Sequence, residues 1–158
     1  MSARETKRLD GLAQLWAMLG AGVPASIGET LGFSLVEVDA GRAVFEGQPD
    51  RRVYNPIGSV HGGYAATLLD SACGIAAHSQ LAADEGYTTL ELKVSYLRGL
   101  SDKSGRVRAE GRVVSRGRRV VFAEAALVDG AGRLCATATS TLLVFSLPPV
   151  EPPRAETE

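Results

Sequence analysis

The chain has 158 residues, a usual length for one domain with a single hydrophobic core. Hydrophobic residues make up 45% of it and charged residues 22%, as is ordinary for a soluble globular protein. The formal net charge of -1 argues against a protein that binds nucleic acid or an anionic membrane through its overall charge.

The cysteines and histidines exclude several kinds of site. Cys73 and Cys135 lie far apart and form neither a disulfide framework nor a zinc signature. His61 and His78 are also well separated, without the clustering of metal ligands, so we expect no metal site and no cofactor. The first residues show no apolar run behind a basic start, so we expect no signal peptide and a cytoplasmic location.

The first predicted element is an amphipathic helix over residues 4–19. Its apolar positions recur every three or four residues: Leu9, Leu12, Leu15, Trp16 and Leu19. Gly20 and Gly22 end the helix, and Pro24 prevents its continuation. We assign residues 1–30 to this helix and a linker, which we expect to pack on the outside of the domain or on a partner subunit.

Strand patterns make up most of the remaining chain. Residues 31–37 and 42–46 form a predicted hairpin, with Gly41 at the turn position that needs a positive φ. After a long apolar stretch come four more predicted strands: 87–97, 106–114, 119–128 and 134–145. Alternation in the first of these places Thr89 on the same face as Glu91. Residues 31–147 form the predicted domain, and the proline- and glutamate-rich residues 148–158 a disordered tail.

The long apolar stretch, residues 64–77, is rich in alanine and leucine and predicts a buried helix. Thr67, Asp70 and Ser71 are spaced three and four residues apart and form one polar stripe on it. The stretch is too short, and too interrupted by Asp70, to span a membrane. One long helix among predicted strands indicates an α+β fold, an antiparallel sheet packed on a central helix.

Two features of this helix point to chemistry. Its first turn leaves backbone N–H groups unpaired at the positive end of the helix dipole, and Gly62 and Gly63 leave them accessible. Such groups can polarise a carbonyl. A buried carboxylate, Asp70, needs a partner or a function. The structural alternatives are a tight turn capped by Ser59 or His61 and a satisfied core carboxylate.

Three short motifs carry a family resemblance: Asn55, His61-Gly62-Gly63 and Leu69-Asp70. With this spacing, the chain from about Leu31 to Phe145 resembles the hotdog-fold acyl-CoA thioesterases, and among them the PaaI-type branch of phenylacetate metabolism. The resemblance implies a curved antiparallel sheet wrapped around the long helix.

The resemblance also implies catalytic roles. Asp70 matches the carboxylate that acts as general base or nucleophile, and Gly62 matches the glycine whose N–H polarises the thioester. Asn55 would position water or the thioester, although a turn residue before proline is an equal alternative. His61 is expected to cap the helix or position a group rather than to transfer protons.

Substrate-binding residues follow from the resemblance and from charge. Gly63, the second glycine of the pair, is an expected substrate-binding residue. Thr89 matches a hydroxyl-bearing site position in relatives, and Ser140 and Thr141 match positions near the nucleotide. Residues 103–133 contain eight basic and three acidic residues. A hairpin cluster stands out among the basic ones: Arg116, Arg118 and Arg119. Arginine suits the phosphates of coenzyme A, although a charged strand edge guarded against pairing is the alternative.

The expected function is hydrolysis of an acyl-CoA, with coenzyme A as part of the substrate rather than as a cofactor. One alternative is a non-catalytic acyl-CoA sensor, but the segments outside the domain are too short for an effector. Another is an enoyl-CoA hydratase-like hotdog enzyme, but no histidine follows Asp70 within a few residues.

Helix geometry predicts the assembly. Gly62 and Asp70 are eight residues apart, roughly 12 Å along an ideal helix. One thioester cannot contact both from the same chain, so Gly62 of one subunit and Asp70 of another would share each site. The resemblance implies sites at a dimer interface as well. We therefore expect a homodimer, further assembled into a dimer of dimers.

Overall fold

The computed structural model describes residues 8–22 and 26–149. Nearly all of the tail predicted at 148–158 lies outside these residues. No helix among them is long and apolar enough to cross a membrane. The elements are α1 (Gly11–Ala21), α2 (Ser26–Leu31), β1 (Phe33–Asp39), β2 (Arg42–Gly47), the 3-10 turn η1 (Arg51–Val53), α3 (Gly62–His78), β3 (Glu85–Tyr96), β4 (Val107–Arg116), β5 (Val120–Val128) and β6 (Leu134–Ser146).

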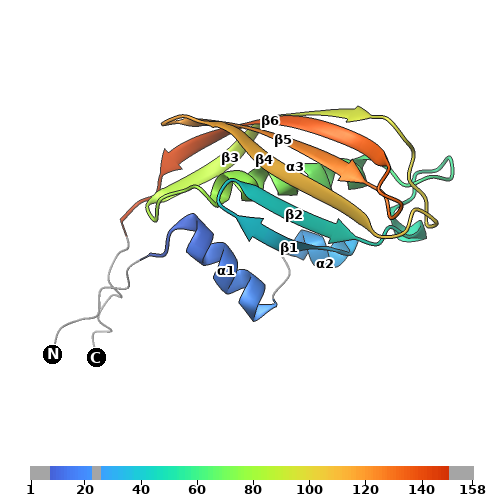
Figure 1. Ribbon diagram of the computed structural model, residues 1–158, viewed down its shortest axis with the longest axis horizontal. Coiled ribbons are helices and arrows are strands. Elements are labelled where there is room, and N and C mark those ends of the chain that lie inside the picture. Colours follow the sequence, from blue (N-terminus) through green and yellow to red (C-terminus); the bar gives the residue numbers. More distant parts are fainter. Residues whose placement is uncertain (1–7, 23–25, 150–158) are drawn as a thin grey trace, which may run out of the picture.

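The six strands form one antiparallel sheet in the order β1-β2-β4-β5-β6-β3. The sheet curves around α3, with α1 and α2 beside its β1 edge (Figure 1). This confirms the α+β prediction and the hotdog arrangement that the resemblance implied. The predicted first hairpin is also confirmed, with Gly41 at a φ of 77°.

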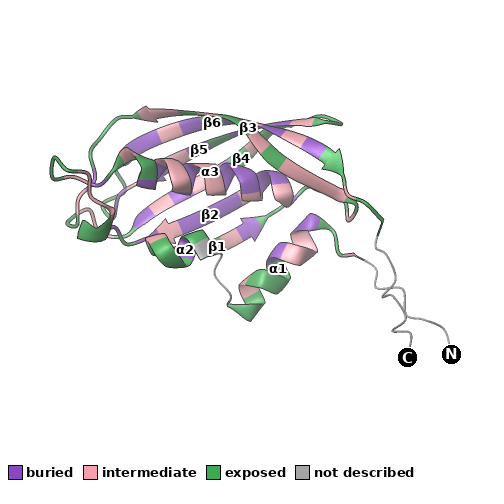
Figure 2. Ribbon diagram, turned by 180° about the vertical axis from the view of Figure 1, so that it is seen from behind, coloured by how far each residue is buried: buried purple, intermediate pink, exposed green. Residues whose placement is uncertain are grey.

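The core lies between the sheet and α3, which rests in the hollow of the sheet (Figure 2). Leu68, Leu69 and Ala72 are fully buried on the side of the helix that faces the strands. A side chain at Gly111 of β4 would run into the backbone of Ala72, so glycine is needed for this close approach. The prediction of a buried helix over residues 64–77 is confirmed.

The N-terminal segment differs from its prediction. Residues 8–10 are not helical; α1 begins at Gly11, because Asp10 caps it by accepting a hydrogen bond from the Ala13 N–H at 2.9 Å. Gly20 lies within α1, and Gly22 ends the helix with a φ of 63°. The short helix α2 was not predicted, since six residues are too few to show a helical period.

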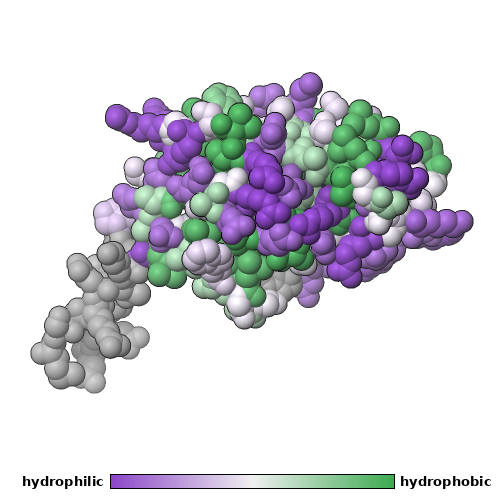
Figure 3. Space-filling view, viewed as in Figure 1, coloured by the Kyte–Doolittle hydropathy of each residue, from purple (hydrophilic) through white to green (hydrophobic). Residues whose placement is uncertain are grey.

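Ion pairs cover part of the sheet's outer face, the face away from α3. Arg42 lies 2.9 Å from both Glu37 and Glu110, and Arg108 lies 3.0 Å from Glu46. Figure 3 shows hydrophilic side chains gathered across the middle of this view. Part of the basic excess of residues 103–133 is neutralised by acids on β1 and β2, since Arg108 pairs with both Glu37 and Glu46.

One buried side-chain polar atom in the described part of the chain lacks a hydrogen-bond partner. The Tyr64 side chain is only 3% exposed, and its hydroxyl makes no hydrogen bond. It points at Gly47, where there is no room for a side chain. Burial and the nearby Asp50 raise the pKa of Tyr64 to about 12, so the phenol stays neutral.

We predict that Tyr64→Phe stabilises the protein. The substitution keeps the ring and removes a buried hydroxyl whose desolvation costs about 1–3 kcal/mol. The free energy of unfolding, from urea denaturation, should rise by up to this amount. Tyr54→Phe is the matched control, because the Tyr54 hydroxyl is hydrogen-bonded to Asp102 at 2.9 Å and its loss should destabilise. A lower stability for Tyr64→Phe would contradict the prediction.

Candidate active site

The start of α3 leaves one backbone N–H group free. His61 is the N-cap residue, and its Nδ1 atom accepts a hydrogen bond from the Gly63 N–H at 2.8 Å. The His61 carbonyl accepts from the Tyr64 N–H at 3.0 Å. Within the described residues the Gly62 N–H donates to nothing. It is thus a free donor at the positive end of the helix dipole, whereas the Gly63 N–H is already occupied.

Close approach, not backbone conformation, explains the glycine pair. Neither Gly62 nor Gly63 has a positive φ. A Cβ atom on Gly63 would lie 2.9 Å from Nδ1 of the capping His61. A Cβ atom on Gly62 would lie 3.1 Å from the ring of Tyr96, at the end of β3. The capping role predicted for His61 is therefore present in the geometry, and each glycine makes room for a particular side chain.

A pocket of about 220 Å³ opens beside Gly62. Its walls come from the start of α3, the end of β3 and the start of β6; they include His61, Gly62, Tyr96, Arg98, Leu100 and Cys135. The free N–H lies at this pocket, and the exposed Arg98 adds a positive charge to its rim. An anionic oxygen would find favourable electrostatics here.

Asp70 lies two turns further along α3, on the stripe that the sheet does not cover. It is partly buried, and its Oδ1 atom accepts a hydrogen bond from Thr89 Oγ1 at 3.1 Å. The other carboxylate oxygen has no hydrogen-bond partner among the described residues. One oxygen is therefore fixed by Thr89, and the other is available to take a proton.

The predicted orientation of Thr89 was wrong. A β-bulge between Thr89 and Glu91 shifts the register of β3 against β6. Thr89 therefore faces inward to Asp70, while Glu91 pairs with the outward-facing Thr141. An unbroken alternation would have placed Thr89 outside. The structure thus places the Thr89 side chain in contact with Asp70, whereas the strand pattern alone placed it on the outer face of the sheet.

Ser140 supports this bulge. Its side chain is 3% exposed, and its hydroxyl donates to the Glu91 carbonyl at 3.0 Å. Thr141 points outward, 3.3 Å from the Glu91 carboxylate. The two residues matched to the nucleotide site therefore lie on opposite faces of the sheet, and the Ser140 hydroxyl lies within the fold.

The groups around Asp70 offer no competing nucleophile. Cys73, one turn along α3, is fully buried. Burial, together with the charges of Asp70 and Glu124, raises the pKa of its thiol to about 12, so the thiol stays protonated. Burial and Asp70 also raise the pKa of Tyr87. Asp70 is the group in this neighbourhood suited to accept a proton.

The Asn55 side chain is engaged in its own loop. Its Oδ1 atom accepts from the N–H groups of Ile57 and Ser59 at 3.1 and 3.2 Å, and its Nδ2 atom donates to Ser59 Oγ at 3.0 Å. In the single chain Asn55 therefore shapes the turn that leads to α3, the structural alternative weighed for it.

The arginine hairpin lies far from Gly62 in one chain. Arg116 forms a 2.8 Å ion pair with Glu85, the first residue of β3, whereas Gly62 lies beside Tyr96, the last. The two ends of β3 are about 36 Å apart at roughly 3.3 Å per residue. Arg118 and Arg119 are exposed and form no ion pair within the described chain.

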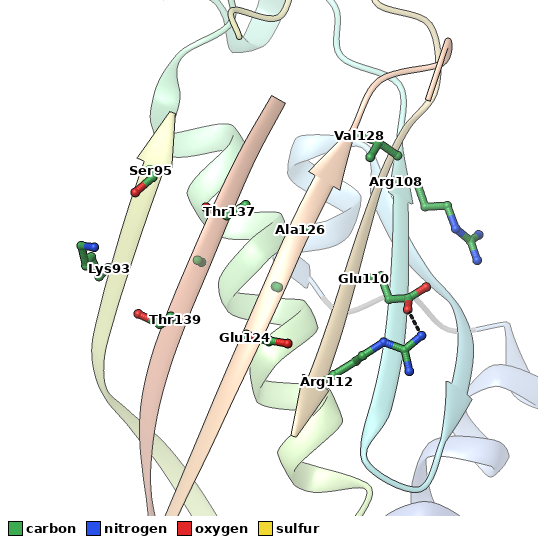
Figure 4. A pocket seen from close by; sticks show the side chains of 12 residues that line it. Lys93, Ser95, Arg108, Glu110, Arg112, Glu124, Ala126, Val128, Thr137 and Thr139 are labelled. Carbon is green, nitrogen blue, oxygen red and sulfur yellow. Dashed lines mark ion pairs between the residues drawn. The ribbon is translucent and has the colours of Figure 1, made fainter. Parts of the chain in front are cut away.

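A larger hollow lies elsewhere. It has a volume of about 530 Å³ and sits on the outer face of the sheet, across strands β3 to β6 (Figure 4). Charged side chains and threonines line it, including Lys93, Glu124, Thr137, Thr139 and the ion pair of Glu110 with Arg112. The sheet separates this hollow from Asp70, so it is not the candidate site. No cluster suited to a metal ion occurs among the described residues.

Comparisons with known proteins identify the family. A model of the thioesterase superfamily matches residues 57–136. The chain is 28% identical to a 1,4-dihydroxy-2-naphthoyl-CoA hydrolase of Listeria monocytogenes, over 73% of this chain and 93% of the relative. It is 33% identical to the proofreading thioesterase EntH of Klebsiella pneumoniae, over 68% and 77%.

A solved structure of a thioesterase family protein from Silicibacter pomeroyi has the same fold. Its TM-score is 0.73 at 29% identity, covering 86% of this chain and 96% of that one. The residues matched by the model of the thioesterase superfamily include Gly62, Gly63, Asp70 and Thr89. The chain belongs to the thioesterase superfamily and is a thioester hydrolase.

Proposed function

We propose that this protein hydrolyses an acyl-CoA thioester to the free acid and coenzyme A, with Asp70 and Gly62 as its catalytic groups. The observation that carries the proposal is that α3 presents one free N–H, at Gly62, and one carboxylate oriented by Thr89. A hydrolase of thioesters needs these two groups, a proton acceptor for water and a donor for the developing oxyanion.

The proposed steps use no metal or other cofactor. Asp70 takes a proton from water as the water oxygen attacks the carbonyl carbon, and the Gly62 N–H stabilises the oxyanion. The tetrahedral intermediate then collapses, the C–S bond breaks, and the sulfur leaves with the proton held by Asp70. Direct attack by the Asp70 carboxylate, followed by hydrolysis of the anhydride, uses the same two groups.

We propose that each site forms between two subunits. Within one chain the two groups are roughly 12 Å apart along α3, too far to contact one carbonyl. Two features support a partner: β3 is a 12-residue edge strand, and Leu90 on it is 59% exposed. A second copy, related by a two-fold axis, would cover this edge and the open stripe of α3. We also propose that two such dimers associate into a dimer of dimers.

In this assembly, the subunit that supplies Asp70 also supplies the arginines. Thr89, which holds Asp70, is four residues from Glu85 on β3, about 13 Å along the strand. Glu85 in turn contacts Arg116 at the hairpin. Arg118 and Arg119 form no ion pair with the described residues and are suited to the phosphates of coenzyme A, which lie far from the thioester.

The acyl group is open to test, and an aromatic one has some support. The Listeria relative is named for an aromatic acyl-CoA, and the sequence resembles the PaaI-type branch. A panel of aromatic, arylacetyl and aliphatic acyl-CoA substrates, assayed by release of free thiol, tests both the activity and the acyl preference. If no member of the panel releases thiol, the proposed function fails.

We predict that Asp70→Asn lowers kcat at least about 100-fold without changing the fold, because it removes the proton acceptor. Gly62→Pro should lower kcat by about 10²–10³, because it deletes the N–H at the first helical position, where proline is well tolerated. Circular dichroism checks folding, and thiol release measures kcat.

Two controls isolate these effects. Asp84→Asn removes an exposed carboxylate away from the site and should leave kcat unchanged. Gly62→Ala keeps the N–H and adds only the methyl group near Tyr96, so it should cost less than Gly62→Pro. A folded Asp70→Asn with wild-type turnover, or equal losses for the two Gly62 variants, would contradict these roles.

We predict that replacing Arg118 and Arg119 with alanine raises KM for acyl-CoA about tenfold or more. The KM for a short thioester without the nucleotide should not change, because that substrate lacks the phosphates. Arg112→Ala, on the outer face of the sheet, is the matched control. Equal changes in KM for both substrates would show that Arg118 and Arg119 do not bind the phosphates.

We predict that two inactive variants, Asp70→Asn and Gly62→Pro, complement each other once their subunits exchange. About half of the dimers would then be mixed, each with one intact site, so about a quarter of wild-type activity should return. Mass spectrometry of isotope-labelled subunits verifies the exchange. Exchange without recovered activity would show that the two groups do not meet across an interface.

A further inference from the structure

Tyr96 makes a contact at the start of α3 that the proposed steps do not use. It is the last residue of β3, and its side chain is 56% exposed. Its hydroxyl nevertheless donates to the Gly62 carbonyl oxygen at 2.8 Å. The ring lies directly on Gly62, since a Cβ atom there would be 3.1 Å from it. A surface tyrosine is therefore held in one place against the glycine.

With this contact, side chains hold the Gly62–Gly63 peptide group at both ends. Tyr96 binds its carbonyl oxygen, and Nδ1 of His61 binds its N–H at 2.8 Å. The preceding peptide group carries the free Gly62 N–H, and its carbonyl accepts from the Tyr64 N–H at 3.0 Å. Both peptide groups that meet at the Gly62 Cα are thus fixed, and the N–H of Gly62, a residue that lines the pocket, is left free.

Two consecutive glycines need such restraint. Glycine permits a wide range of φ and ψ, so an unrestrained pair at a helix start would sample many orientations. An oxyanion donor is effective only when it is held in place before the reaction, because its reorientation then adds no cost to the barrier. A misplacement of about 1 Å can cost as much as 100-fold in rate.

We propose that Tyr96 is a positioning residue for the reaction: its hydroxyl fixes the direction of the Gly62 N–H toward the thioester carbonyl. The proposal rests on the function proposed above for Gly62. Tyr96 acts through the peptide backbone, and its hydroxyl hydrogen is committed to the Gly62 carbonyl rather than to the substrate.

The kinetic test is Tyr96→Phe, which keeps the ring on Gly62 and removes the hydroxyl. We predict that kcat falls about tenfold, less than the roughly 10²–10³ expected for loss of the donor itself, while KM stays within about twofold. Tyr54→Phe is the matched control, because it also removes a hydrogen-bonded hydroxyl from a tyrosine that is not fully buried, here one bound to Asp102. The control should keep its kcat.

A second measurement needs no substrate. Amide hydrogen exchange, followed by NMR, reports the opening of the Gly63 N–H···His61 bond at the other end of the same peptide group. In Tyr96→Phe this amide should exchange about fivefold faster, as expected for the loss of one supporting hydrogen bond. In Tyr54→Phe it should exchange at the wild-type rate.

The outcomes separate this proposal from the proposed function. Lower kcat at constant KM, together with faster Gly63 exchange in Tyr96→Phe alone, supports the positioning role. Unchanged kcat or unchanged exchange in folded Tyr96→Phe overturns it, and so do equal effects in both tyrosine variants. If the wild-type chain hydrolyses no thioester, the proposed function fails, and the exchange rates still decide whether Tyr96 orders the glycine pair.

Discussion

The close packing of α3 against the curved sheet is the constraint on which the rest of the structure depends. A helix fits into this hollow only if its sheet-facing side is small, and Ala65, Ala72 and Ala76 are nearly or fully buried there. Gly111 lets the β4 backbone reach the helix backbone. Because the sheet covers so much of α3, chemistry is confined to the N-terminal end of the helix and to one uncovered stripe.

Charge is divided between the two faces of the sheet. On the inner side, Asp70 lies among neutral groups, since the Cys73 thiol stays protonated and Thr89 contributes only a hydroxyl. On the outer side, arginines and glutamates of β1, β2 and β4 neutralise one another. The sheet thus keeps a network of surface ion pairs away from the carboxylate that is proposed to exchange protons.

The fold was predictable because its strongest signals are local. The alanine-rich stretch over residues 64–77 gave α3, and Gly41 gave the first turn. The features that the sequence could not show depend on contacts between residues far apart in the chain, on local caps, or on interruptions of the strand alternation. The bulge at Thr89 breaks an alternation that the residues themselves do not mark. Tyr96 meets Gly62 across 34 residues, so no periodicity connects them. The Asp10 cap, rather than the leucine spacing, decides where α1 begins.

The bulge in β3 has a consequence for how this fold can change. On either side of it, residues of the same parity along the chain face opposite sides of the sheet: Thr89 points inward, while Glu91 and Lys93 point outward. Deleting Leu90, the extra residue of the bulge, would restore a single phase and leave Thr89 on the inner face, opposite the buried Leu142, and every strand would still pair. A length change of one residue at this position, invisible in the topology, would therefore keep the carboxylate joined to its support.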